Sequence, residues 1–392
     1  MADVLLMVPL FMAVASGWWL GRREGSRRNL AQHPSIGRDY FTGLDYLVNE
    51  RTDEAIESFI RALEVNSDTL PAHLALAKLL RRKGDVERAI GLHQDLLRRS
   101  DLSGSDRLRV RMALARDYDA VGLLDRAEAL LQEIVAENPP RDQLCEALRL
   151  LIKLYEKEGE WRLALDAAER LGRDDFNDIR SELAHYCCEL AEVDLRADKL
   201  ESADAWLGRA LMLDADSVRA SLLRARVRML RQRWRDALRS LQRVPGQDAQ
   251  FVSEVLAPMT RCYRELGLLD EYDSWLRQMM SVAPSASLIL ALAERIGEAR
   301  GLDSAAAFIT EELEKRPSIK GFNRLIDIHI EQGPEKARDG LQVLRGLAGQ
   351  LEQSKPVYHC NHCGFSGRTL LWQCPSCKSW GTTRPIRGLE GE

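Results

Sequence analysis

Most of the middle of this 392-residue chain consists of a motif that recurs every 34 to 39 residues. Seven segments align with one another, from TDEAIESFIRALEVNS to GLLDEYDSWLRQMMSVAP, and each has one residue at the same central position. That residue is small in six segments and a tyrosine in the last: Ala55, Ala89, Ala127, Ala164, Ala203, Ala237 and Tyr272. A repeat of this length is a supersecondary unit that buries its apolar face by stacking on its neighbours.

Other positions of the motif indicate a pair of helices in each copy. Twelve residues before the central residue the side chain is mostly small, as close helix packing needs: Gly43, Ala77, Ala115, Ile152, Ala191, Ala225 and Thr260. Pro139 and Pro284 follow the second helix in two copies, where proline ends a helix. We therefore predict an all-α superhelix of eight or nine tetratricopeptide repeats over residues 36–350, with an eighth copy around Ala306. A generic helical bundle would give no reason for so regular a period.

Stacked helix pairs of this kind form a concave groove that binds peptides or protein surfaces. The position after the small residue of the first helix is basic in five of seven copies, namely Lys78, Arg116, Lys153, Arg226 and Arg261. Such a column would favour an acidic segment of a protein partner. The alternative is a solvated face in an arginine-rich chain. The net charge of −4 gives no indication of a nucleic-acid role.

The N-terminal segment reads as a membrane anchor. Residues 4–20 carry no charge, are mostly apolar, and would span about 25 Å as a helix. The arginines follow this segment, in GRREGSRR, and positive residues stay on the cytoplasmic side. We predict a single transmembrane helix at 1–20, a basic linker at 21–35 and a cytoplasmic bulk. A cleavable signal peptide is the rival interpretation, with AVAS at 13–16 as a cleavage pattern, but its positive charges would precede the apolar run.

Four cysteines near the other end predict a metal site. Cys360, Cys363, Cys374 and Cys377 form two C-x2-C pairs separated by ten residues. Two such turns facing each other supply four thiolates in a tetrahedron, which suits one zinc or one iron ion. Four sulfurs leave no open coordination position, so the site is a structural staple or a one-electron iron centre. We place this domain at 356–384, docked on the last repeats, with a tail at 385–392.

No constellation of catalytic residues accompanies these features. The chain has no G-x4-G-K-[ST], H-E-x-x-H or G-x-S-x-G motif, so we expect no enzyme activity and no small-molecule substrate. The dispersed histidines read as surface or capping residues: His33, His73, His93, His185 and His329. The four remaining cysteines, which lie in helical segments, read as small buried side chains.

Three segments together resemble one family. They are GWWLGRR at the end of the anchor, AHYCCELA at 184–191, and the tail SKPVYHCNHCGFSGRTLLWQCPSCKSW. The chain is similar over its whole length to the lipopolysaccharide assembly protein B family of Gram-negative bacteria. The resemblance implies an inner-membrane adaptor that brings the deacetylase LpxC to the protease FtsH and answers to a lipopolysaccharide-sensing membrane regulator. It also implies a rubredoxin-type knuckle ligated by the four tail cysteines.

Two other classes of function stay open at this level. A rubredoxin-like iron centre would serve electron transfer, although no site for a redox partner is evident. A general scaffold for envelope assembly complexes would use the same repeats without a dedicated proteolytic role. A ferric S4 centre is red and a zinc centre is colourless, so colour separates the electron-transfer protein from a zinc-stapled adaptor.

Overall fold

The computed structural model describes residues 38–65, 70–389 and 391. These residues form two units, and the chain passes from the first to the second between Gly159 and Glu160. The predicted anchor at 1–20 and linker at 21–35 lie outside the described residues. Within the described part, no helix has both the length and the apolar character required to cross a membrane.

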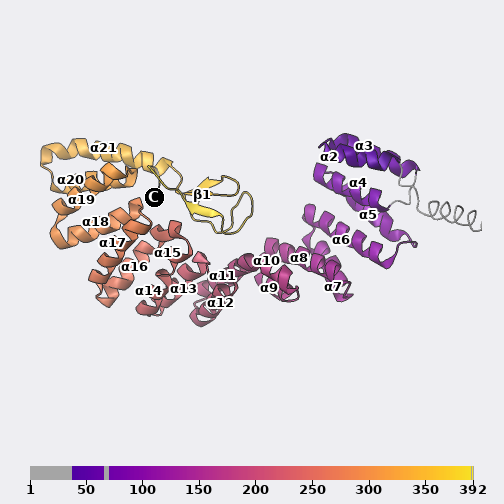
Figure 1. The fold of residues 1–392 in the computed structure, drawn as a ribbon, viewed down its shortest axis with the longest axis horizontal. Helices are drawn as coiled ribbons and strands as arrows, with labels where there is room; N and C mark the ends of the chain where they lie inside the picture. Colours follow the sequence, from indigo (N-terminus) through magenta and orange to yellow (C-terminus); the bar gives the residue numbers. More distant parts are fainter. Residues whose placement is uncertain (1–37, 66–69, 390, 392) are drawn as a thin grey trace, which may run out of the picture. The chain divides into compact units, whose positions relative to one another are not determined.

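The first unit consists of antiparallel helices joined by short turns (Figure 1). In chain order they are α2 (Arg38–Val48), α3 (Thr52–Val65), α4 (Leu70–Lys83), α5 (Val86–Arg98), α6 (Gly104–Ala120), α7 (Leu124–Ala136) and α8 (Arg141–Glu158). The apolar faces of α2, α3, α4 and α5 meet in a core that includes Phe59, Leu76 and Leu80. Most helices of this unit are amphipathic, so they are held by packing more than by their own propensity.

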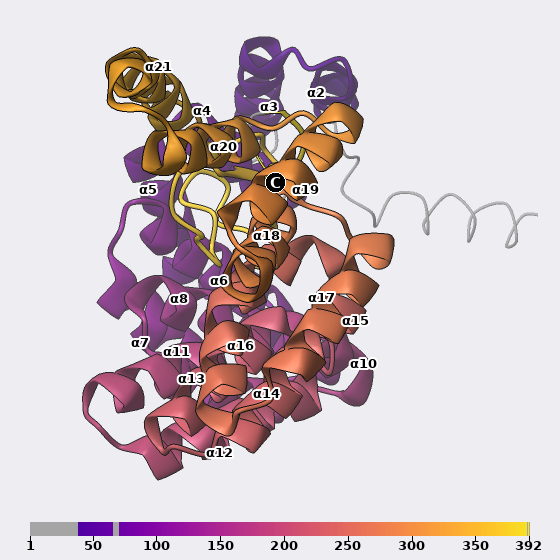
Figure 2. The ribbon, with the colours of Figure 1, turned by 90° about the vertical axis from the view of Figure 1, so that its left-hand side faces the viewer.

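The second unit continues the pattern and ends in a small sheet. Its helices are α9 (Trp161–Glu169), α10 (Arg173–Asp178), α11 (Arg180–Arg196), α12 (Leu200–Leu213), α13 (Val218–Leu230), α14 (Trp234–Leu241), α15 (Val244–Gln247), η1 (Ala249–Phe251), α16 (Val252–Leu266), α17 (Leu269–Val282), α18 (Ala286–Arg300), α19 (Leu302–Lys315), α20 (Ile319–Gln332) and α21 (Glu335–Ser354). Figure 2 shows the pairs following one another from α12 to α21. This arrangement agrees with the predicted all-α repeat fold.

The small positions of the motif do what the sequence requires of them. All six central alanines are fully buried, and a Cβ added at Gly43 would lie 3.0 Å from the ring of Phe59. Tyr272 is also fully buried, although it is large. Its hydroxyl lies 2.9 Å from Thr260 Oγ1, so the polar partner stands at the other small position of the same repeat. Tyr272 and Thr260, which replace the two small residues of the motif in this repeat, therefore pair with each other.

A hydrogen bond recurs between consecutive repeats. A glutamine five residues after the central alanine of one repeat donates its side-chain amide to a tyrosine hydroxyl on the first helix of the next, at 3.1 to 3.2 Å: Gln94 to Tyr118, Gln132 to Tyr155 and Gln242 to Tyr263. These tyrosines occupy the same position of the motif. The bond satisfies a partly buried hydroxyl at each joint, which fixes the register of neighbouring repeats.

The C-terminal segment forms an antiparallel sheet of three short strands. These are β1 (Tyr358–Cys360), β2 (Ser366–Gly367) and β3 (Thr383–Pro385), in the order β2-β1-β3. We call residues 358–385 the knuckle. Its few buried residues include Cys360, Cys374 and Thr383, so it has almost no apolar core of its own.

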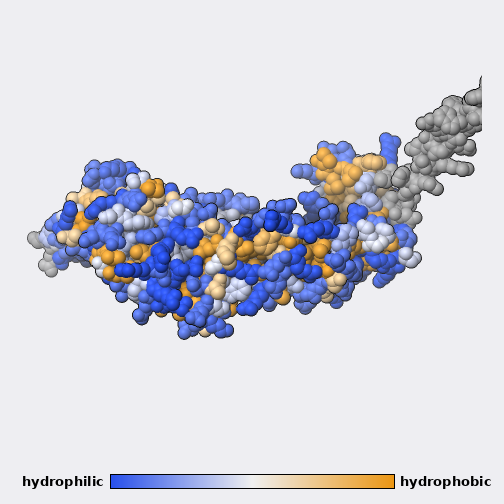
Figure 3. All heavy atoms as spheres, turned by 60° about the horizontal axis from the view of Figure 1, so that its bottom comes forward, coloured by the Kyte–Doolittle hydropathy of each residue, from blue (hydrophilic) through white to orange (hydrophobic). Residues whose placement is uncertain are grey.

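The surface between these elements is mixed. On the face in Figure 3, apolar patches interrupt a mainly hydrophilic covering. At the C-terminal end of the second unit, α21 exposes Val343, Leu344, Leu347 and Leu351. An apolar outer face on a terminal repeat is unusual, because end repeats of a solenoid normally carry a polar outer face.

Candidate metal centre

The two cysteine pairs of the knuckle converge on one point. The four Sγ atoms of Cys360, Cys363, Cys374 and Cys377 all lie within 4.8 Å of one another. Cys360 Sγ is 3.8 Å from Cys377 Sγ, and Cys363 Sγ is 3.6 Å from Cys374 Sγ. Four sulfurs held about 2.3 Å from a single ion stand about 3.8 Å apart in a tetrahedron. The thiols are free and their spacing fits one tetrahedral ion.

Hydrogen bonds and burial set the acidity of these thiols. The Thr382 hydroxyl, 3.2 Å from Cys360 Sγ, acts with the N–H groups of Cys363 and His362 to lower the pKa of the Cys360 thiol to about 6. Burial raises the pKa of the Cys374 thiol to about 11. A bound cation offsets that burial, because it stabilises the thiolate form directly. The donor set therefore suits a zinc or a single iron ion, as the sequence predicts.

The knuckle is docked on the repeats through Trp380. Its ring stacks on His185 of α11, with centroids 5.0 Å apart and planes inclined by 20°. It meets Trp161 and Tyr186 edge-on at 6.0 and 6.1 Å, and the guanidinium carbon of Arg219 lies 5.8 Å from its centroid. One knuckle side chain thus contacts α9, α11 and α13 together. Aromatic pairs of this kind add to the free energy of burial.

A second tryptophan and a hydrogen bond hold the other side of the knuckle. Trp372 stacks on Phe251 of η1, with centroids 5.5 Å apart and planes inclined by 18°. The hydroxyl of Tyr358 donates to Glu254 Oε1 of α16 at 2.7 Å, across 104 residues of chain. Docking therefore uses aromatic area for affinity and a charged acceptor for orientation.

The expected docking on the last repeats was wrong. The knuckle lies instead on α9, α11, α13, η1 and α16, and Arg384 of β3 forms an ion pair with Asp248 at 2.8 Å. The tail does reach α20, where Ile319 N–H donates to Leu389 O at 3.0 Å. The aromatic and charged partners that match Trp372 and Trp380 belong to earlier repeats, and the sequence distance gave no sign of this.

Two histidines expected at the surface are buried. His93 is 1% exposed and His185 is 6% exposed. Burial, with Arg219 and Arg384 nearby, lowers the pKa of His185 to about 3, so the ring stacked on Trp380 is neutral. The sequence signal that was available is the AHYCCELA segment, which places His185 and Tyr186 under the knuckle. Trp372 and Trp380 were not singled out, although they flank the second cysteine pair.

The pKa of His185 predicts how acid affects the second unit. The unfolded imidazole takes a proton near pH 6.5, whereas the folded one takes it near pH 3. The contribution of the neutral His185 ring to the free energy of unfolding is therefore complete above pH 6.5, and it falls as the pH drops toward 3. We expect the free energy of unfolding to decrease by about 2 kcal/mol from this group between pH 7 and pH 5. Urea unfolding of the wild type and of His185→Phe at both pH values measures it, and equal losses in the two proteins would contradict the assignment.

The predicted groove residues are spread over both units. In the first unit Lys78 is exposed on α4, Arg116 forms an ion pair with Glu146, and Lys153 forms one with Glu156 at 2.9 Å. Internal acids therefore neutralise two of these three cations. That they bind a partner stays a prediction.

The remaining two predicted groove residues belong to the second unit, and both are exposed. Arg226 lies on α13, and Arg261 lies on α16 with its guanidinium carbon 5.4 Å from the ring centroid of Trp234. A cation held over an aromatic ring keeps its charge available to solvent and to other molecules.

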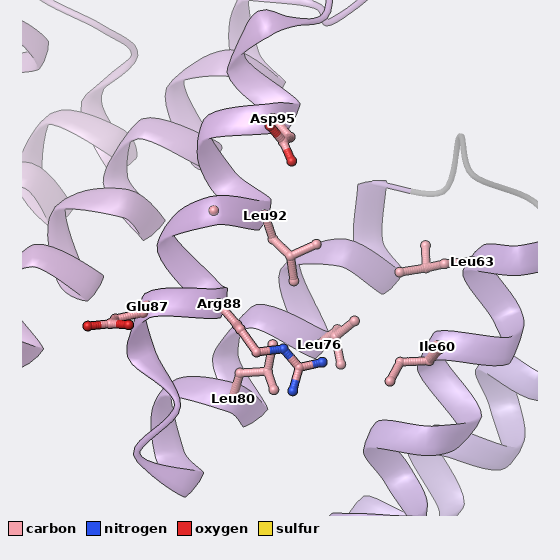
Figure 4. Close-up of a pocket in the computed structure, with 9 residues that line it drawn as sticks. Ile60, Leu63, Leu76, Leu80, Glu87, Arg88, Leu92 and Asp95 are labelled. Atoms are coloured by element: carbon pink, nitrogen blue, oxygen red, sulfur yellow. The ribbon is translucent and has the colours of Figure 1, made fainter.

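The first unit also contains a cleft of about 740 Å³ between α3, α4 and α5 (Figure 4). Its walls are aliphatic, from Ile60 and Leu63 on one side to Leu92 on the other. Glu87, Arg88 and Asp95 also line it, and Arg88 forms an ion pair with Asp85 at 3.0 Å. The cleft therefore offers mainly aliphatic contact surface with charged side chains beside it.

Comparison with known proteins agrees with the repeat fold and with the metal-binding knuckle. Residues 358–385 match a family model described as a rubredoxin metal binding domain, and residues 72–108 match a tetratricopeptide repeat. Lipopolysaccharide assembly protein B of Escherichia coli (strain K12) is 37% identical over 388 residues, 99% of each chain. The protein of that name from Haemophilus influenzae is 32% identical over 395 residues, 98% of this chain and 99% of its own. The chain therefore belongs to the lipopolysaccharide assembly protein B family.

Proposed function

We propose that this protein is a non-enzymatic adaptor in lipopolysaccharide assembly, anchored in the bacterial inner membrane, that brings the deacetylase LpxC to the protease FtsH. The observation that carries the proposal is the 37% identity to a lipopolysaccharide assembly protein over 99% of both chains. A match of that extent covers the N-terminal segment, the repeats and the knuckle alike. The role in lipopolysaccharide assembly is the general part of this proposal, and delivery of LpxC to FtsH is the specific part.

The architecture supports an adaptor more than a catalyst. Tetratricopeptide repeats present extended surfaces to protein partners. The four tail thiols would close the coordination shell of their ion, so it cannot bind a substrate. The exposed cations Lys78, Arg226 and Arg261, together with the aliphatic cleft of the first unit, provide charged and apolar contact surface. We therefore assign the contacts with LpxC, FtsH and a lipopolysaccharide-sensing regulator to the repeats.

The anchor at 1–20 would supply the second element of an adaptor. Confining a binding protein to the membrane raises the local concentration of its cargo near a membrane protease. Affinity for the cargo then needs no increase for degradation to accelerate. This reasoning assigns distinct tasks to the anchor and to the repeats, and the two tasks can be separated by deletion.

The test is the half-life of LpxC in cells that carry a truncation lacking residues 1–20. We expect the truncated protein to be folded and to bind LpxC, but LpxC to survive as long as it does in cells without the protein. The control is a variant in which an unrelated single-pass anchor with the same orientation replaces residues 1–20, which should restore degradation. If the soluble truncation shortens the half-life of LpxC as well as the intact protein does, the tethering role is wrong.

A further inference from the structure

The second cysteine pair of the knuckle and the two docking tryptophans form one structural element. Cys374 and Cys377 lie between Trp372 and Trp380, and the two arms of this turn are joined by a hydrogen bond from Gly381 N–H to Trp372 O at 2.7 Å. An isolated antiparallel β-bridge pairs Gln373, the residue after Trp372, with Trp380. The conformation that aims both thiols at the ion therefore also sets the spacing of the two rings.

The rings of Trp372 and Trp380 both pack against helices of the repeats. Trp380 packs on His185 and Trp161, and Trp372 packs on Phe251 and against the core of the second unit. Apart from these rings and the polar contacts of Tyr358 and Arg384, the knuckle has few buried residues to hold it. A segment this small depends on its metal for a defined structure. Ion binding and docking must then favour each other by the same factor, because coupled equilibria are reciprocal.

The docked interface buries polar groups that have no partner within the protein. His185 Nδ1, Arg219 Nε and Nη1, and Thr383 Oγ1 are buried without a hydrogen-bond partner. The other guanidinium nitrogen of Arg219 is well paired, with Glu189 at 2.7 Å and Glu192 at 2.8 Å. His185 and Arg219 border a cavity of about 210 Å³ between the repeats and the knuckle, which is large enough to hold water.

We propose that the knuckle is a metal-dependent latch, in which Trp380 and His185 are positioning residues that tie retention of the ion to docking on α11 and α13. The inference rests on the proposed metal site and goes beyond it. Loss of the ion releases the latch and uncovers Arg219, His185 and the aromatic side chains beneath Trp380, while the helices stay folded. Occupancy of the metal centre therefore decides whether the surface of α11 and α13, the first helices of two repeats, is covered or exposed.

The experiment uses the full chain with one equivalent of zinc. The rate of zinc transfer to a chromogenic chelator and the hydrogen exchange of α11 and α13 amides are measured for the wild type and for Trp380→Ala. We expect zinc loss to accelerate about tenfold and exchange to rise in both helices, because the stacking contacts are lost. The control is Trp206→Ala on α12, a tryptophan that stacks with Arg162 and Arg209 and should leave both readouts unchanged.

Three further variants decide the outcome. His185→Ala removes the ring on which Trp380 stacks, so we expect faster zinc loss than in the wild type, whereas His185→Phe keeps a ring and should restore a rate close to that of the wild type. Cys374→Ser should raise the exchange of α11 and α13 as Trp380→Ala does, with α18 and α19 unaffected. Equal zinc loss in the wild type and Trp380→Ala, loss from His185→Phe as fast as from His185→Ala, or no change in exchange on metal removal would each overturn the latch. A wild-type chain that binds no metal would instead overturn the metal site itself.

Discussion

Replacing Cys374 by serine is expected to abolish metal binding and unfold the knuckle, while the helices of both units remain folded. Cys374 is fully buried, and its Sγ lies 3.6 Å from that of Cys363. A structural zinc ion contributes an apparent 10 to 16 kcal/mol, about as much as a small domain has in total, so losing one of four ligands removes the main support of residues 358–385. Elemental analysis should give no bound metal, and protease should cleave after Ser354, where α21 ends.

The matched control for this prediction is Cys262→Ser. Cys262 is also a fully buried thiol of the second unit, but it lies on α16 outside the metal site. That variant should lose some stability and keep one metal ion per chain. Full metal occupancy in Cys374→Ser would contradict the four-cysteine site. The wild-type preparation also identifies the ion, because ferric iron in four sulfurs is red and zinc is colourless.

Replacing Asp117 by alanine is expected to destabilise the first unit by about 3 to 5 kcal/mol. Asp117 of α6 is fully buried, and its two oxygens lie 2.5 Å from Arg81 Nη1 of α4 and 2.5 Å from His93 Nδ1 of α5. His93 Nε2 has no hydrogen-bond partner, so removing the carboxylate leaves the ring without any. The cost arises from the partly buried Arg81 cation and the buried His93 imidazole, which lose their common partner. Urea unfolding of the first unit measures it.

Asp119 provides the comparison for Asp117, two residues further along the same helix. Its carboxylate is one-third exposed and forms an ion pair with Lys157 at 2.6 Å. A partly solvated pair of this kind contributes at most about 1 kcal/mol, so Asp119→Ala should cost far less. Equal losses in the two variants would mean that helix propensity dominates and that the buried network contributes little.

The sequence alone determined the parts of this protein that obey a local or periodic rule. Small residues at a constant spacing predicted the close contacts within each repeat, and Ala55 and Gly43 are buried accordingly. The two C-x2-C pairs predicted their own convergence, because four soft ligands in so short a segment have few other ways to satisfy a metal ion. Both signals come from residues that are near one another in the chain.

Only the tertiary structure decided where the knuckle lies and which histidines are buried. Tyr358 contacts Glu254 across 104 residues, and Trp380 stacks on His185 across a longer span. Such contacts depend on how helix pairs stack, and stacking leaves no mark at a fixed distance in the sequence. The pairing of Arg116 and Lys153 with acids is likewise decided by neighbouring turns and helices. A periodic pattern therefore specified the scaffold, whereas non-local packing of aromatic and charged side chains determined the surface that the knuckle covers.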